Sequence, residues 1–548
     1  MTRSVKRCIL MAVLLILLVL ALIYGIICSS KTDAPPPQTT LDAYSETVFN
    51  PLRNDDYLAD AKLSMQENGL DYTNYWVMAG TAINVLLNEG PTDDVRNIVQ
   101  CLADTFDRYG YFPRPAYQQF EYGWVSSMDA PVIAVLAQMM YEKTGETQYQ
   151  EFVQRLSDYM LTDVSQHGYV AKIKGNKWLF EYADANTTLQ TGEFVLNGSL
   201  LGTLGTAMIA STTGNAKLWA LVESQTALYE KMMPQYWYED GSWCYYMLNP
   251  KRVNPPHYVL FEIRLFQALA EVTGKDFYQQ EGQRRIDLLK DYYKLYVYEE
   301  NGDRCYSFLR SGAPHYYYTD IYNTELIFLD EQGRELARDR AEGREAGDAW
   351  MHGSYPEGTT RVEWHVVPNV SWSVDMGDLS IEYLTPEQQN CPAPLPCSYS
   401  ASADGSMAGT TLTIRPDLSE ETRCNLMGKL SSAGRASPNQ IYALELENLS
   451  EETFSTNIVL YDTARNVISR YLVTLIPGKN LLVFALPGFA EQGLTPLKNL
   501  ASFNLRIYTM DMETEQAEIH VGNLYPFDNP VQFWTQHTTG EYKINWGE

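Results

Sequence analysis

The spacing of apolar residues changes once along the chain, and this change sets the fold class. From residue 41 to about 345, apolar residues recur at spacings of three and four, as in Val95–Phe106 and Leu260–Val272. That spacing places them on one face of an α-helix. From about residue 346, apolar and polar residues alternate, as in Ile441–Glu447, which is typical of β-strands. The sequence therefore predicts a multidomain α plus β protein, with helices first and strands second.

The connectors between the expected helices alternate in length. A T-G-x-x-x-Y turn recurs at Thr144–Tyr149 and Thr273–Tyr278, whereas Tyr109–Trp124 and Tyr236–Tyr258 are long and aromatic. Helical hairpins with short turns on one rim and long loops on the other predict an α/α toroid, or incomplete α/α barrel, over residues 41–345. Sugar sites in such toroids usually lie on the long-loop rim, which is an analogy of fold alone.

The β-rich region is expected to contain one domain and a connection. Residues 399–548 predict an antiparallel β-sandwich, because short alternating segments are separated by turn residues such as Pro477–Asn480. The order of strands resembles jelly-roll carbohydrate-binding modules. Residues 346–398 hold several prolines and predict either the first strands or a connection between the two regions.

An uncharged run near the amino terminus predicts one transmembrane anchor. The run from Cys8 to Cys28 would reach about 30 Å as a helix, enough to cross a bilayer. Arg3, Lys6 and Arg7 precede it, so residues 1–28 are expected to comprise a cytoplasmic tip and a signal-anchor. The bulk would then be extracytoplasmic, at a cell surface or in a Golgi lumen. A lipidated Cys28 is the alternative, and residues 29–40 read as a proline-rich spacer.

Composition excludes several other classes of protein. The formal net charge is -27, which argues against a general nucleic-acid binder, since such proteins carry a basic face. The cysteines beyond the anchor are widely spaced and form no CxxC pair, so the sequence predicts neither a zinc site nor a disulfide scaffold. No cofactor and no metal are predicted. A homodimer is left open.

Four motifs then occur in a fixed order. They are W-V-S-S-M at Trp124–Met128, W-x-x-E-Y at Trp178–Tyr182, F-V-L-N-G at Phe194–Gly198, and a segment at 245–258 that bears Tyr and His. In this order and spacing, residues 60–295 resemble the C-terminal helical domain of D-glucuronyl C5-epimerases. The resemblance implies an isomerase that inverts C5 of glucuronate in heparosan-type polysaccharides, as in heparan sulfate biosynthesis. It also implies that neither a metal nor a nucleotide takes part in the chemistry.

The required chemistry can be stated from the substrate alone. The C5 hydrogen of a uronate lies α to a carboxylate, so its removal needs that carboxylate to be neutralised. Inversion then needs one proton-transfer group on each face of the ring. A tyrosine can serve where a cation lowers its pKa or a carboxylic partner holds its proton. The pairs Glu181–Tyr182 and Tyr245–Tyr246 offer such groups.

The resemblance assigns roles to particular residues. The candidate catalytic residues are Tyr182, Glu181, Tyr245, Tyr246, His257 and Tyr258. Tyr182 matches a catalytic tyrosine, and a second family tyrosine falls at either Tyr245 or Tyr246. His257 matches a family histidine, but Pro256 stands where the family has tyrosine, and Tyr258 is the candidate replacement.

Substrate binding is expected from cations and from side chains that suit a sugar. The candidates are Lys172, Lys174, Lys177, Trp124, Asn197 and Arg252. The cations would form a local basic region for a polyanion, which the net charge would otherwise repel. Each candidate also has a structural reading, since the lysines suit a solvated hairpin face and Trp124 suits a core. The motif containing Asn197 also suits helix packing.

Two other functions remain open at this point. A uronate polysaccharide lyase begins with the same C5 deprotonation and then expels the C4 substituent, so the same tyrosines could serve it. A non-catalytic, membrane-anchored carbohydrate-binding protein is the other alternative, and the proline before His257 favours it. A glycosidase is disfavoured, because it needs two carboxylates across the scissile bond and the sequence identifies no partner for Glu181.

Overall fold

The computed structural model describes Leu41 and residues 74–546 with gaps, the longest of which are 311–324, 341–349, 486–498 and 534–542. The anchor expected at residues 8–28 lies outside the described residues. Among the helices of the described part, none is long and apolar enough to cross a membrane.

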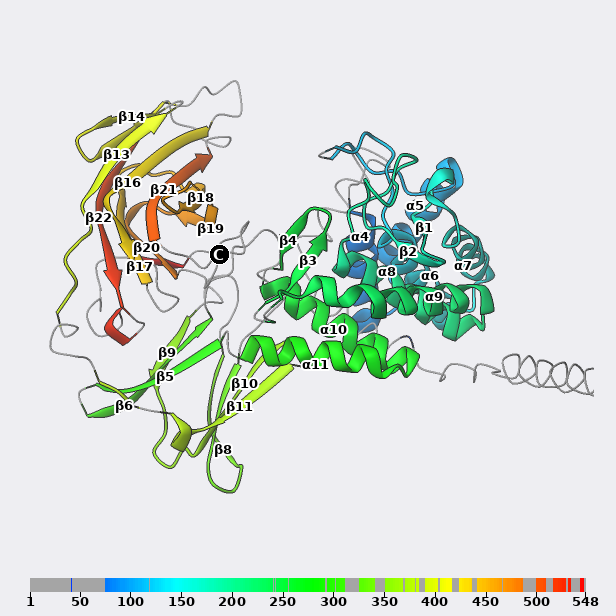
Figure 1. The fold of residues 1–548 in the computed structure, drawn as a ribbon, viewed down its shortest axis with the longest axis horizontal. Helices are drawn as coiled ribbons and strands as arrows, with labels where there is room; N and C mark the ends of the chain where they lie inside the picture. Colours follow the sequence, from blue (N-terminus) through cyan, green and yellow to red (C-terminus); the bar gives the residue numbers. More distant parts are fainter. Residues whose placement is uncertain are drawn as a thin grey trace, which may run out of the picture.

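Helical hairpins occupy residues 75–290 (Figure 1). Four helices form an inner row in which each helix contacts the next. They are α4 (Tyr75–Glu89), α6 (Asp129–Thr144), α8 (Leu196–Thr213) and α10 (Pro256–Thr273). Each is followed by an outer partner: α5 (Asp93–Tyr109), α7 (Thr147–Tyr159), α9 (Ala216–Met232) and α11 (Asp276–Lys290). The two rows agree with the helical hairpins that the apolar spacing predicts.

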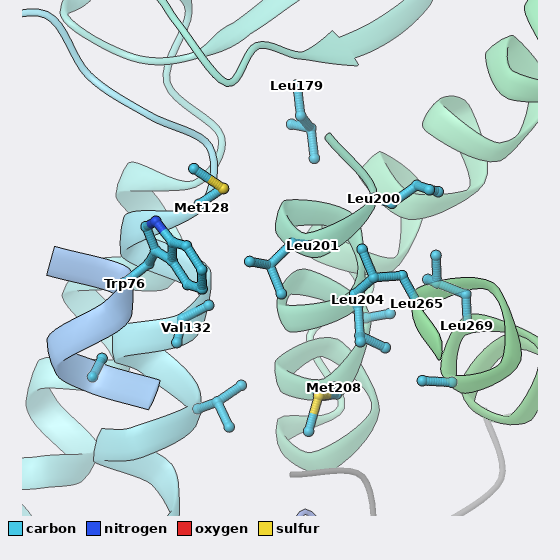
Figure 2. Close-up of a cluster of buried hydrophobic side chains, with 14 of the residues drawn as sticks. Trp76, Met128, Val132, Leu179, Leu200, Leu201, Leu204, Met208, Leu265 and Leu269 are labelled. Atoms are coloured by element: carbon cyan, nitrogen blue, oxygen red, sulfur yellow. The ribbon is translucent and has the colours of Figure 1, made fainter. Parts of the chain in front are cut away.

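The inner helices are apolar on nearly all sides because neighbours cover them on both flanks. Figure 2 shows Val132 of α6 and Leu201 of α8 between these two helices, and Leu265 of α10 on the other side of α8; all three belong to one buried cluster. Two glycines let α8 approach α6 closely. A Cβ at Gly202 would lie 2.6 Å from the carbonyl oxygen of Ser127, and one at Gly205 would lie 2.7 Å from Cβ of Pro131.

The long connectors all gather at one rim. Short turns at Gly90, Gly145, Gly214 and Gly274 join each inner helix to its outer partner, and these glycines have positive φ. The connectors from an outer helix to the next inner helix are long. They contain the segment 111–125, the hairpin β1 (Val170–Ile173) with β2 (Asn176–Leu179), and the hairpin β3 (Tyr245–Leu248) with β4 (Lys251–Val253). They therefore meet near the amino-terminal ends of the inner helices.

Strands begin earlier than the sequence analysis expected. The last helix of the described part before this region ends at Lys290, and strands occupy much of 293–382, including 293–340, which was assigned to the helical region. One sheet has the order β12 (Ile381–Glu382), β5 (Tyr293–Glu300), β6 (Asp303–Arg310), β9 (Trp350–Ser354). The other has the order β11 (Val370–Asp375), β10 (Arg361–Val367), β7 (Glu325–Leu329), β8 (Glu335–Arg340). The signal overlooked was Asn301-Gly302 between two alternating segments, a typical hairpin turn.

The carboxy-terminal region forms two sheets around a shared core. One has the order β13 (Cys397–Ser402), β16 (Arg423–Arg435), β21 (Asn499–Tyr508), β18 (Phe454–Tyr461), β19 (Val467–Leu475). The other has the order β14 (Gly405–Ala408), β15 (Thr411–Ile414), β22 (Ala517–Phe527), β17 (Ile441–Asn448), β20 (Gly478–Ala485), β23 (Lys543–Trp546). Inward residues of both sheets, such as Leu444 and Leu505, share one core, as the period-two alternation predicts.

The two middle sheets contact both larger regions. Trp364 and Trp372 belong to the same buried cluster as the helices, and the indole nitrogen of Trp372 donates to the carbonyl oxygen of Ile286 in α11 at 3.2 Å. On the other side, Tyr296 and Tyr298 of β5 pack with Ile441 and other residues of the sandwich. Residues 293–382 thus join the helical region to the sandwich through packed surfaces.

Candidate active site

The long connector between α5 and α6 forms a two-stranded arm over residues 111–125. Backbone bridges pair Arg114 with Trp124 and Tyr117 with Phe120. Three rings of this arm surround the ring of Tyr182, with centroid distances of 5.9 Å for Tyr117, 5.9 Å for Phe120 and 5.2 Å for Trp124. Tyr117 is 47% exposed, so this aromatic cluster reaches the surface.

The backbone that carries Glu181 and Tyr182 is fixed by pairing with the arm. Val125 N donates to the oxygen of Ala183 at 2.8 Å, and Ala183 N donates to the oxygen of Val125 at 3.0 Å. Trp178 of β2 and Phe180, which follows that strand, are completely buried. The motif W-x-x-E-Y therefore places two apolar anchors in the core and delivers the carboxyl and phenol groups beside Trp124.

Glu181 carries a buried carboxyl group that lies against the first turn of helix α8. It is 8% exposed, and a Cβ on Gly198, in the first turn of α8, would overlap its Oε2 atom. Burial raises the pKa of Glu181 from 4.5 to about 7, against the opposing effects of a hydrogen bond with Tyr182 and the charge of Arg114. At neutral pH the group is therefore poised between its two protonation states.

Tyr182 is the hydrogen-bond partner of Glu181. Burial, followed by the negative charge of Glu181, raises the pKa of Tyr182 well above its usual value of 10.0. Tyr182 is accordingly a neutral phenol near pH 7, and its hydroxyl is the donor to the carboxylate. Tyr258 is close enough to add to the same upward shift.

Tyr246 of β3 and Tyr258 of α10 pack against each other beside Glu181 and Tyr182. Their ring centroids lie 5.4 Å apart, at an interplanar angle of 71°. Burial raises the pKa of Tyr246, while the charge and hydrogen bond of Arg252 act in the opposite direction. Glu181 is among the groups whose charge reaches Tyr246. The structure thus brings Glu181, Tyr182, Tyr246, Tyr258 and Arg252 together.

Tyr245 packs away from this cluster. The pairing of β3 with β4 is irregular between Tyr245 and Met247, so the ring contacts of each tyrosine indicate where it faces. The ring of Tyr245 packs 4.7 Å from the ring of Tyr238, with Nζ of Lys251 4.8 Å from its centroid. Of the two positions that the sequence left open, Tyr246 is therefore the one beside Tyr182.

The other expected residues have varied positions. His257 lies in the first turn of α10, and its side chain is outside the described part. Asn197 is buried and its Oδ1 accepts from the backbone N of Gly198 at 2.9 Å, which is a packing role. Trp124 faces Tyr182, as a substrate-side aromatic would, and its indole nitrogen donates to the oxygen of Pro115 at 2.6 Å.

The three lysines are not the cations of this cluster. Lys172 and Lys174 are exposed on the β1–β2 hairpin, and the backbone N of Lys177 donates to Oγ of Ser224 in α9 at 3.0 Å. Two arginines, Arg114 and Arg252, instead act on the pKa values of Glu181 and Tyr246 respectively.

Sequence reasoning missed several residues of the cluster. Arg114 forms a buried two-point ion pair with Asp129, with Nε to Oδ2 at 2.8 Å and Nη2 to Oδ1 at 2.5 Å. Its guanidinium also lies 5.0 Å from the ring of Trp124. Glu193, which is 8% exposed, influences both Glu181 and Tyr246. These residues lie in irregular connectors, so no periodic spacing of apolar residues marks them. The available signal in the sequence was a polar residue within an aromatic loop.

Within the described residues, no group of three or more His, Cys, Asp or Glu is arranged to hold a metal ion.

Fold and site together define a helical-hairpin protein with a buried Glu–Tyr pair at its long-loop rim. Residues 105–287 match the family described as D-glucuronyl C5-epimerase C-terminus. This match confirms the family resemblance expected from the four motifs, and the matched segment contains every residue of the cluster named above. No curated protein matches the chain.

Several solved structures are similar to parts of the chain. An unsaturated glucuronyl hydrolase from Bacillus sp. GL1, responsible for the degradation of glycosaminoglycan, is 15% identical over 47% of this chain and 75% of its own, with a TM-score of 0.31. An alpha-1,6-mannanase from Salegentibacter sp. HEL1_6 is 11% identical over 46% and 70%, with a TM-score of 0.30. An agarase is 14% identical over 26% of each chain, with a TM-score of 0.20. The chain spans about a quarter of the length of such agarase structures, and likenesses of this size do not bear on function.

Proposed function

We propose that the helical region is a C5-epimerase of D-glucuronate residues within a polysaccharide, and hence an isomerase. The observation that carries this proposal is the convergence of two phenol groups from separate connectors, Tyr182 and Tyr246, beside one arginine, Arg252. Inversion at C5 needs a proton acceptor on one face of the ring and a donor on the other.

Glu181 and Tyr182 act on one face as a unit. The hydroxyl of Tyr182 takes the C5 proton while it passes its own proton to the Glu181 carboxylate. A pKa of about 7 suits Glu181 for receiving that proton near neutral pH. The electron pair of the C5–H bond moves into the substrate carboxylate.

Tyr246 and Arg252 act on the other face. Tyr246 gives its proton to C5, and the hydrogen bond and charge of Arg252 stabilise the phenolate that results. The same guanidinium is suited to the substrate carboxylate, because arginine pairs with carboxylates in a planar, two-point geometry. Return of the proton from Glu181 to Tyr246 through solvent completes the cycle, so no net proton is gained or lost.

The setting of the enzyme belongs to the same proposal. The uncharged run at 8–28 would anchor it in a membrane with the bulk extracytoplasmic, at a cell surface or in a Golgi lumen. Its partner would be a uronate-containing polysaccharide, with the carboxy-terminal sandwich as an accessory carbohydrate-binding domain. A homodimer remains open to measurement.

The test is hydrogen exchange at C5 in D₂O, followed by NMR on heparosan and chondroitin. We expect the wild type to exchange C5 hydrogen and Tyr182→Phe to lose at least about a hundredfold in rate, since general acid–base groups typically contribute that much. Tyr182→Phe should keep the wild-type melting temperature within a few degrees. No exchange on any uronate polymer would sink the proposal.

Adjacent tyrosines provide a matched comparison. Tyr246→Phe should lose exchange as Tyr182→Phe does, whereas Tyr245→Phe should retain it, because the ring of Tyr245 packs against Tyr238 instead. A new absorbing, unsaturated sugar end in the same assay would instead identify the lyase alternative. Retained glycan affinity without exchange would identify a non-catalytic binding protein.

A further inference from the structure

The five-stranded sheet of the carboxy-terminal sandwich has a polar outward face. On β21, Leu505 and Ile507 point into the sandwich core, so Arg506 between them points outward. The register places Asn425 of β16 and Asn457 of β18 directly beside Arg506, one on each side. These three side chains therefore form one row across three adjacent strands.

Two amides on this face have oxygen atoms that lack a donor. Asn457 and Asn504 are 4% and 8% exposed, and among the described residues the Oδ1 atom of each has no hydrogen-bond partner. The Nδ2 atom of Asn504 donates to Oδ1 of Asn425 at 3.2 Å, so these two amides are held together on the face. A buried amide oxygen without a donor is costly, because its lost hydration is not replaced. A ligand that brings hydroxyl donors to this face would supply the missing bonds.

The strands of this sheet contain basic residues and no acidic ones. No Asp or Glu occurs in β13, β16, β18, β19 or β21, although the whole chain has 68 of them against 41 Lys and Arg. Lys429 and Arg506 lie on the outward face, and none of the described carboxylates forms an ion pair with either. The strands of the other sheet contain Glu445, Glu447 and Glu518. The five-stranded sheet is therefore a region of positive charge in an acidic chain.

The face is open to solvent along its β13 edge. Ser398, Ser400 and Ser402 of this edge strand are exposed, and their register with β16 continues the polar rows to the edge of the sheet. Exposure decreases from these serines through the half-buried Arg506 to the buried Asn457. A ligand can therefore approach from the β13 edge towards the amides in the middle of the sheet.

We propose that this outward face binds an acidic polysaccharide, with Arg506 and Lys429 paired to uronate carboxylates and the amides of Asn457 and Asn504 bonded to sugar hydroxyls. This inference rests on the proposed function, to which it adds a second binding site, on the sandwich. Holding the polymer there would raise its local concentration at the helical region.

The composition of the face favours a sugar polymer over a nucleic acid. Amides and serine hydroxyls can both donate to and accept from sugar hydroxyls, which every ring of a polysaccharide carries. A nucleic acid presents a dense row of phosphates, and its affinity comes mainly from many Lys and Arg contacts. Two outward cations among many neutral polar groups match a polymer whose charges are spaced between uncharged rings.

The experiment measures binding of heparosan to the full-length protein by calorimetry. The variants are Arg506→Gln and Lys429→Gln, and the control is Arg415→Gln, which removes an exposed charge after β15 of the other sheet. We expect each variant to bind heparosan at least about fivefold more weakly than wild type, and the control to bind it as wild type does. Each variant should keep the wild-type melting temperature within a few degrees.

Two comparison ligands test which chemistry is recognised. Heparosan in which each carboxylate is reduced to an alcohol should bind the wild type at least about fivefold more weakly than heparosan, because the arginine and lysine then lose their partners. Single-stranded DNA of similar length should also bind more weakly than heparosan. Equal binding of the reduced polymer, or tighter binding of the DNA, would overturn the proposal.

C5 exchange in D₂O on the same wild-type samples separates this proposal from the epimerase proposal. Weaker heparosan binding by both variants, without exchange in the wild type, would overturn the epimerase proposal and leave the binding face of the sandwich intact. Equal heparosan binding by wild type, Arg506→Gln and Lys429→Gln would overturn the binding face, whatever the exchange result.

Discussion

At the scale of single residues, the cluster is governed by the burial of one carboxyl group. Glu181 lies against Gly198 and is hydrogen-bonded to Tyr182, and burial outweighs both Arg114 and Tyr182 in setting its pKa. A protein that needed only stability would place an apolar residue there. Carboxyl groups with raised pKa are a recurring feature of active sites, because they can exchange protons near neutral pH.

This pKa predicts how activity depends on pH. The Glu181 carboxylate must be deprotonated to accept the proton of Tyr182, so the exchange rate should rise with pH and level off above about pH 7. The measurement is the rate of C5 exchange between pH 5 and 9. In Glu181→Asp the midpoint should move, whereas a midpoint unchanged in that variant would assign the titration to another group.

The same group predicts a change in stability. A carboxyl whose pKa is about 7 when folded and near 4.5 when unfolded binds its proton more tightly in the folded state. Its contribution therefore favours folding at low pH and is lost as pH rises from about 4.5 to about 7, by an amount on the order of 3 kcal/mol.

Denaturant unfolding of wild type and Glu181→Gln at pH 5 and pH 8 measures this effect. Relative to wild type, Glu181→Gln should be more stable at pH 8 than at pH 5, while losing activity at both. A free-energy difference between the two proteins that does not change with pH would contradict the burial of an ionisable group.

At the scale of elements, helix α8 links packing to the site. Its glycines allow contact with the segment leading into α6, and its first turn receives the Glu181 carboxyl. The spacing of Gly198, Gly202 and Gly205 places all three on neighbouring turns of one helix. The close packing at these glycines thus sets both the spacing of α8 from α6 and the distance from Glu181 to the first turn of α8.

Alanine substitutions test this double role. Gly202→Ala should lower the free energy of unfolding by about 1–3 kcal/mol, because its Cβ would overlap the backbone of Ser127. Gly198→Ala should lower the rate of C5 exchange strongly and the free energy of unfolding only slightly. The added Cβ would displace the side chain of Glu181, which can move. Gly377→Ala, where no atom lies within 4 Å of the added Cβ, is the control for both measurements. Loss of activity in the control, or none in Gly198→Ala, would contradict this reading.

At the scale of the whole molecule, the two middle sheets pack against both the helical region and the carboxy-terminal sandwich. Phe328, Trp364 and Trp372 pack into the same cluster as the helices, while Tyr296 and Tyr298 pack against the sandwich. The outward apolar residues Ile441 and Leu481 of the sandwich are covered by this contact. Residues 293–382 are therefore not a free linker, and removing them would expose apolar surface in two places.

Truncation measures this coupling. A chain that ends at Lys290 should bind a hydrophobic dye and melt at a lower temperature than one that ends after Glu382, since large exposed apolar patches favour association. The single substitution Trp372→Ala should cost about 3–5 kcal/mol in the longer chain. Equal melting temperatures for the two truncated chains would mean that the helices are stable without the sheets.

Local patterns in the chain predicted the helical hairpins and the sandwich strands, and the four motifs led to Glu181 and Tyr182. These features depend on local spacing, and spacing is visible in a single chain. Strands at 293–340 were missed even though Asn301-Gly302 was a local signal.

Tertiary structure decided which groups meet. The choice of Tyr246 over Tyr245 depended on which rings each residue packs against, and the choice of Arg114 over the lysines depended on how the arm folds back over Tyr182. Glu193 was recognised only through its burial and its electrostatic influence on Glu181 and Tyr246. The physical reason is that proton affinity and charge recognition depend on distance and burial. At this site both are set by irregular connectors that bring together residues far apart in the sequence.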